Sequence, residues 1–317
     1  MHNLVGLGQN PPGDRSATGW WFYLGGLSGL RGTEMCLSVR WTSFFGMETV
    51  EFNGASFWVE SLGSEKDPAL ILIHSGIASA RMWDPIVVAL SGVHHVIRYD
   101  CREFGRTTTE NVVFSDVDDL LAVMAGTGVE RATLIGASRG GGIAVDAALE
   151  HPDQVTGLVT IGSSPSGFPE VQLNCQEQIV SDRLDELLAR GEHVAVNRLE
   201  AELWAAGTTR ALSELDPAFL QMSYALNAEN LPRVRDVATR TPPRQSAYAR
   251  AVDILVPSLF VVGDHDLSPA RAGTSYLLAA VPNATEARFP DSAHSPSIEH
   301  PAEFIQVVSA WLNENRL

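Results

Sequence analysis

The strongest candidate for chemical reactivity in this 317-residue chain is a serine with a glycine two residues away on each side. It lies in the sequence Gly136-Ala137-Ser138-Arg139-Gly140. An apolar run precedes it and a helical pattern of small residues follows, which predicts a sharp turn between a strand and a helix. The flanking glycines are needed because strand and helix cross closely there. Such a turn exposes the serine hydroxyl beside the free N–H groups of a helix start, which can bind a developing negative charge. Ser138 is therefore a candidate nucleophile for covalent catalysis.

A nucleophilic serine needs a general base, and the base needs a group that orients it. In an open parallel sheet, these groups are expected where strands end at their carboxyl side. Of the nine histidines, three lie at the carboxyl side of a predicted strand: His74 ends one, and His265 and His294 follow others. His294 lies in a loop of small residues after the last predicted strand, so we expect it to be the base. The acid is expected after the preceding strand, where Asp264 and Asp266 are both candidates.

The sequence Asp264-His265-Asp266 could also suggest a metal site. Neighbouring residues on one tight turn rarely converge on a single ion, however, so solvated loop charges are the favoured interpretation. No cofactor or metal is expected elsewhere.

The elements that must position these residues alternate between apolar strands and helices, which predicts an α/β fold with a mostly parallel sheet covered on both faces. The sequence Asn53-Gly54 predicts a hairpin, and Ser115 is a predicted N-cap of a helix over Asp116–Ala125. The predicted strands are 48–53, 56–61, 69–74, 95–99, 132–137, 155–161, 255–262 and 284–289.

The alternation stops between Phe168 and Arg250, where the pattern is largely helical and no strong strand is predicted. We therefore expect residues 47–167 and 251–317 to form one core, with residues 168–250 inserted as a helical unit. Residues 1–46 hold two acidic and three basic residues and no clear periodicity, so an irregular or flexible N-terminal extension is expected. One hypothesis places the natural start at Met47; the alternative is an appendage whose aromatic residues pack onto the core.

Composition limits the partners that this chain can have. Its formal net charge is −16, which disfavours binding to nucleic acid or to an anionic membrane through a basic surface. No apolar run approaches the roughly 20 residues of a membrane span. The three cysteines include no C-x-x-C pair, so neither a disulfide framework nor a zinc site is indicated, and a reduced cytoplasmic setting is expected.

Four further motifs lie in order at predicted strand ends. They are Leu72–Gly76, resembling an H-G-x oxyanion turn; Tyr99–Thr107, resembling D-x-R-G-x-G-x-S; Gly263–Asp266, fitting G-x-x-D; and His294, Glu299, Pro301 and Phe304, fitting H-x4-E-x-P-x-x-F. Ser75 replaces the usual glycine of the first motif, and Glu103 and Thr107 depart from the second. Together with the serine turn, these motifs make the sequence resemble the α/β-hydrolase family from about residue 48 to residue 312.

The resemblance implies an α/β-hydrolase fold with a helical cap at 168–250, and acyl transfer through a covalent acyl-enzyme. Ser138 would be the nucleophile and His294 its base, while Asp266, at the family's acid position, would orient the base. The backbone N–H groups of Gly76 and Arg139 would form the oxyanion hole. A small ester, lactone or thioester is the expected substrate.

Five residues are candidates for lining the substrate pocket: Ile77, Trp204, Phe219, Met222 and Tyr224. For most cap aromatics, however, packing of the cap against the core is an equally good interpretation.

The charged side chain of Arg139, directly after the nucleophile, has two interpretations. It could meet an acidic group of the substrate or pair with a carboxylate of the cap, and the second is slightly favoured.

Two other functions remain compatible with these motifs. Hydrolysis of a C–C bond in a diketone uses the same triad, and a ligand-binding or regulatory protein can keep this fold with slow turnover. The absence of aspartate at the position of Ser138 argues against the dehalogenase and epoxide hydrolase chemistry of the family.

Overall fold

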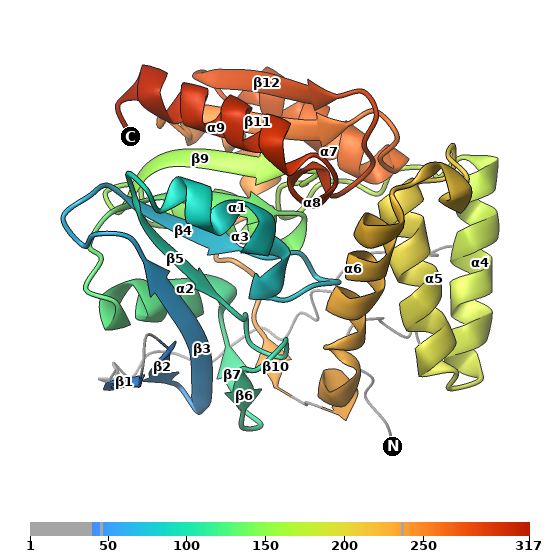
Figure 1. Ribbon diagram of the computed structural model, residues 1–317, viewed down its shortest axis with the longest axis horizontal. Coiled ribbons are helices and arrows are strands. Elements are labelled where there is room, and N and C mark those ends of the chain that lie inside the picture. Colours follow the sequence, from blue (N-terminus) through green and yellow to red (C-terminus); the bar gives the residue numbers. More distant parts are fainter. Residues whose placement is uncertain (1–39, 45–46, 236–237) are drawn as a thin grey trace.

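A single twisted sheet forms the centre of the molecule (Figure 1). The structure, a computed structural model, describes residues 40–44, 47–235 and 238–317. The main strands run in the order β1-β2-β3-β5-β4-β8-β9-β11-β12, and the six from β5 to β12 are parallel. Their bounds are β1 Arg40–Phe44, β2 Met47–Phe52, β3 Ala55–Leu62, β4 Ala69–Ile73, β5 His95–Tyr99, β8 Ala132–Ala137, β9 Val155–Ile161, β11 Ser258–Gly263 and β12 Ala284–Phe289. The predicted α/β architecture is confirmed.

The antiparallel end of the sheet contains the predicted hairpin. Strands β2 and β3 pair through a turn in which Asn53 and Gly54 both have positive φ, at 44° and 71°. This is the conformation that an Asn-Gly hairpin turn requires. Strand β1 pairs antiparallel with β2, so the prediction that residues 1–46 are irregular is wrong for Arg40–Phe44. Pairing with the open edge of β2 stabilises this segment, which has no periodicity of its own; the rest of that prediction lies outside the described residues.

Helices cover both faces of the sheet. On one face lie η1 (Ala80–Trp83), α1 (Asp84–Leu90) and α9 (Pro301–Asn315); on the other lie α2 (Asp116–Gly126), α3 (Arg139–Glu150) and α7 (Ser268–Ala280). Ser115 caps α2, because its hydroxyl accepts the Asp118 N–H. The short α8 (Pro296–Glu299) precedes α9.

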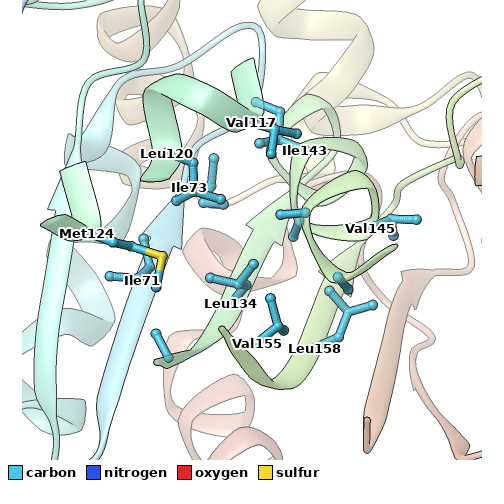
Figure 2. Close-up of a cluster of buried hydrophobic side chains, with 14 of the residues drawn as sticks. Ile71, Ile73, Val117, Leu120, Met124, Leu134, Ile143, Val145, Val155 and Leu158 are labelled. Atoms are coloured by element: carbon cyan, nitrogen blue, oxygen red, sulfur yellow. The ribbon is translucent and has the colours of Figure 1, made fainter. Parts of the chain in front are cut away.

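The apolar layer between the central strands and helices α2 and α3 fixes the position of α3 (Figure 2). Aliphatic side chains of β4, β8 and β9 meet those of both helices there: Ile71, Ile73, Leu134 and Leu158 with Val117, Leu120, Met124 and Ile143. Burying each such side chain contributes about 1.5–3 kcal/mol. The start of α3, which follows Ser138 directly, is therefore held firmly against the carboxyl end of β8.

Three helices occupy the segment predicted to be helical, and they lie side by side at one end of the molecule (Figure 1). They are α4 (Cys175–Ala189), α5 (His193–Ala206) and α6 (Pro217–Ala228), with η2 (Leu212–Glu214) and η3 (Leu231–Arg235). Asn174 and Glu177 form a capping box at the start of α4. The chain returns to the core through β10 (Thr239–Arg240), which pairs with β7 (Val113–Phe114), while β6 (Thr108–Thr109) pairs with β3.

Two short turns, η4 (Ala247–Ala249) and η5 (Ala251–Asp253), complete the return to the core. Within the described ranges, no helix has the length and apolar character needed to cross a membrane.

Candidate active site

Ser138 sits on a strained turn between β8 and α3, with φ of 50° and ψ of −113°. A non-glycine residue rarely adopts a positive φ, and such strain often marks a functional site. A Cβ atom at Gly136 would lie 2.2 Å from the Gly140 carbonyl oxygen, and one at Gly140 would lie 2.2 Å from the Ile73 carbonyl oxygen. Both glycines are thus required by the close crossing of strand and helix, as the sequence predicted.

The His294 side chain is bonded to Asp266. Its Nδ1–H donates to both carboxylate oxygens, at 2.9 and 2.8 Å, and the two residues are 4% and 5% exposed. Asp266 Oδ1 also accepts the Leu267 N–H at 2.7 Å, which fixes the carboxylate. With Nδ1 as the donor, Nε2 of His294 carries the lone pair and can accept a proton.

The neighbouring residues of the acid loop have other partners. Asp264 is exposed and pairs with Arg288 at 2.5 Å, while the hydroxyl of Thr209 bonds His265 Nδ1 at 2.7 Å. The three side chains do not converge on one point, so they form no common metal site.

Gly162, which the sequence analysis did not single out, connects the serine turn with the histidine–aspartate pair. The Ser138 N–H donates to the Ile161 carbonyl at 2.7 Å, and Gly162 comes next with φ of 56°. A Cβ atom there would lie 2.7 Å from Asp266 Oδ2 and 2.8 Å from His294 Nδ1. Its glycine identity, directly after a predicted strand, was the available signal.

The turn after β4 presents a free donor beside the start of α3. In the described part of the chain, no acceptor is bonded to the backbone N–H of Gly76 or to that of Arg139. His74 holds this turn, since its Nδ1–H donates to the Ser75 carbonyl at 2.7 Å and its Nε2 accepts the Cys101 N–H at 2.9 Å. His74 therefore has a structural role in the turn, and its two hydrogen bonds leave it no free nitrogen for use as a base.

The Arg139 side chain is buried and pairs with Asp116 at 2.5 Å, with the Phe104 ring 4.9 Å from its guanidinium carbon. Burial disfavours its charge, but Asp116 and other neighbours outweigh this effect, so the pKa of Arg139 is raised. Asp116 belongs to α2, so the expectation of a partner in the cap is wrong. Helix α2 packs beside α3, which brings its first carboxylate to the Arg139 side chain.

A small cavity lies beside the turn after β4, beneath α5 and α6. Six of the residues around it are Ile77, Trp204, Ser223, Leu226, Ser295 and Ile298. Ser295 follows His294 and Ile77 follows Gly76 in the chain, so the cavity lies near both His294 and the free N–H group of Gly76.

Of the five residues predicted to line a pocket, Ile77 and Trp204 surround this cavity and the other three do not. Phe219 is buried between α5 and the core, Met222 packs against the apolar core, and the Tyr224 hydroxyl donates to Glu202. Consecutive helical residues point about 100° apart, so α6 can present only one face to the cavity. That face carries Ser223 and Leu226, which the sequence analysis did not select.

Comparison with known proteins places this architecture in one family. A family model described as alpha/beta hydrolase fold matches residues 68–301. The chain is similar to a pimeloyl-[acyl-carrier protein] methyl ester esterase of Edwardsiella ictaluri, at 30% identity over 79% of this chain and 94% of the relative. A protein of the same name from Aliivibrio salmonicida is 27% identical over 81% of this chain and 95% of the relative.

Solved structures give the same fold. An enol-lactonase from Burkholderia xenovorans LB400 superposes with a TM-score of 0.63 at 22% identity, covering 86% of this chain and all of that one. A thermophilic esterase from Thermogutta terrifontis gives 0.67 at 18% identity, covering 89% and 100%. The chain therefore belongs to the α/β-hydrolase fold family. It is an α/β-fold hydrolase.

Proposed function

We propose that this protein is a serine hydrolase that cleaves a small carboxylic ester, lactone or thioester with Ser138, His294 and Asp266 as its catalytic triad. The observation that carries the proposal is the hydrogen bonding of His294 Nδ1–H to both oxygens of Asp266, which in the neutral imidazole places the lone pair on Nε2. The strained conformation of Ser138, one residue before a helix start, supports its role as the nucleophile.

In the proposed mechanism, Ser138 Oγ attacks the substrate carbonyl while its proton passes to His294 Nε2. The oxyanion that forms accepts hydrogen bonds from the Gly76 and Arg139 N–H groups, each worth about 10²–10³ in rate. His294 then gives the proton to the leaving group, and the acyl group stays on Ser138. Water, deprotonated by the same imidazole, hydrolyses this ester and regenerates the enzyme. Every step uses groups of the chain and water.

The lining of the cavity, which combines apolar surface with hydroxyl groups, supports a small ester, lactone or thioester as the substrate. Ile77, Leu226 and Ile298 contribute apolar surface, and Ser223 and Ser295 contribute hydroxyl groups near the reacting centre. The named relatives act on a methyl ester, which supports ester cleavage as the reaction class.

The test combines labelling with turnover. A fluorophosphonate should label the wild type but not Ser138→Ala, and a series of p-nitrophenyl esters of rising chain length should give Ser138-dependent turnover. Labelling with very slow turnover of every ester would instead favour C–C bond hydrolysis or a ligand-binding protein. An unlabelled wild type would refute the proposal.

A further inference from the structure

The carboxyl end of cap helix α5 contacts both the loop that carries Asp266 and the loop that carries His294. A Cβ atom at Gly207 would lie 2.0 Å from the His265 carbonyl oxygen, so the helix end abuts the acid loop. On the other side, Arg210 donates to the Asp291 carbonyl at 2.5 Å and pairs with Glu299 at 2.6 Å. The last turn of α5 is therefore positioned relative to the catalytic loops.

Trp204, in that last turn, contacts His294 in two ways. The two ring centroids are 4.2 Å apart with an interplanar angle of 40°, and the His294 N–H donates to the Trp204 carbonyl at 3.2 Å. Asp266 holds Nδ1 of the same imidazole, and the bare backbone of Gly162 lies against its Nδ1–Cε1 edge. The imidazole is thus confined on three sides, and Trp204 is the side supplied by the cap.

We propose that Trp204 is a positioning residue for the general base, an inference that rests on the proposed serine hydrolase function. The indole keeps the imidazole of His294 in the orientation that directs Nε2 at Ser138. When the proton moves from Ser138 Oγ to His294 Nε2, the imidazole becomes a cation against an aromatic surface, which attracts it. This attraction is stronger in the transition state than in the resting enzyme, so it acts on turnover.

Trp204 also lines the cavity beside Ile77 and Ser295. The indole that contacts the imidazole of His294 therefore also borders the cavity. The cap therefore contributes to the orientation of the base as well as to the space available for the substrate.

Simple packing of the cap is the competing explanation, because Trp204 also touches an apolar cluster of α4 and α5. Leu199 belongs to the same cluster and the same helix and serves as the matched control. Trp204→Leu removes the aromatic face, whereas Trp204→Phe keeps one.

With a p-nitrophenyl ester as substrate, Trp204→Leu should lower kcat by about 10–100-fold, the scale of a misplaced catalytic group, with a much smaller change in KM. Trp204→Phe should restore most of kcat, and Leu199→Ala should stay near the wild type. Equal losses in Trp204→Leu and Leu199→Ala, or a change confined to KM, would overturn the inference.

A second measurement does not depend on catalysis. The Cε1–H proton of His294, assigned by its absence in His294→Gln, should be shifted by the indole ring current in NMR spectra. The shift should disappear in Trp204→Leu and persist in Leu199→Ala. A wild type without Ser138-dependent turnover would refute the proposed function, whereas an unmoved resonance would refute the role of Trp204.

Discussion

Replacing Asp266 by Asn should abolish ester hydrolysis while the fold survives. The carboxylate accepts the His294 Nδ1–H through both oxygens and the Leu267 N–H through Oδ1. An asparagine has nearly the same shape, but its amide group can donate to Nδ1, which favours the tautomer with the proton on Nε2. That tautomer cannot accept the proton of Ser138. The corresponding change in the serine proteases lowers kcat by about 10⁴, and we expect a similar loss here.

The matched control is Asp264→Asn, two residues away on the same loop. Asp264 and its partner Arg288 have side chains that are 39% and 45% exposed. An ion pair in such a setting contributes about 0–1 kcal/mol, so this variant should keep its turnover and lose little stability.

Steady-state turnover of a p-nitrophenyl ester should be measured for both variants, beside their thermal unfolding curves. A folded Asp266→Asn protein with wild-type turnover would show that Asp266 does not orient the base. A loss of turnover in Asp264→Asn would transfer that role to Asp264 and contradict the observed hydrogen bonds.

Three further predictions concern the surroundings of the site. Gly162→Ala should lose most activity, because the added Cβ would lie 2.7 Å from Oδ2 of Asp266, the proposed catalytic acid. Gly128 also has a positive φ, but a Cβ added there would meet no atom within 4 Å, so Gly128→Ala should retain its turnover. Burial raises the pKa of Glu200 to about 7. Because the carboxyl ionises more easily in the unfolded chain, the free energy of unfolding falls as the pH rises from about 4.5 through 7. Glu200→Gln should therefore stabilise the protein at pH 8, by up to about 3 kcal/mol, and leave denaturant unfolding at pH 4 unchanged. Ile77→Ala should alter the ratio of turnover on short and long esters and Met222→Ala should not; the reverse would place the substrate outside the cavity.

The central strands of the sheet could be predicted from the sequence because the residue pattern that indicates them is local. Strands β8 and β9 have the predicted bounds, Ala132–Ala137 and Val155–Ile161, since buried parallel strands are continuous apolar runs between turn signals. The hairpin at Asn53-Gly54 follows equally from the φ angles that these two residues tolerate.

Features that depend on tertiary contacts could not be predicted from local patterns. Residue spacing alone left both Asp264 and Asp266 as candidates; the family resemblance favoured Asp266, which is the one that bonds His294 in the structure. The partner of Arg139 depends on the position of the α2 start, which lies 23 residues away in the chain. The cavity-facing side of α6 is set by how the cap packs, and a weakly amphipathic helix gives no local sign of that side.

The cap is connected to the site at a second point, through the strand on which it returns to the core. One carboxylate oxygen of Asp116 accepts a hydrogen bond from the Arg139 side chain, and the other pairs with Arg240 of β10 at 3.0 Å. One carboxylate therefore joins Arg139, the residue after Ser138, to strand β10, while the last turn of α5 is bonded to His294 through the Trp204 carbonyl. The Arg139 side chain is buried, so moving Asp116 away from it would leave an unpaired buried charge, which is strongly destabilising. Movement of helices α4 to α6 as a unit would disturb the surroundings of both Ser138 and His294, so substrate exchange is expected to involve the loops and side chains around the cavity.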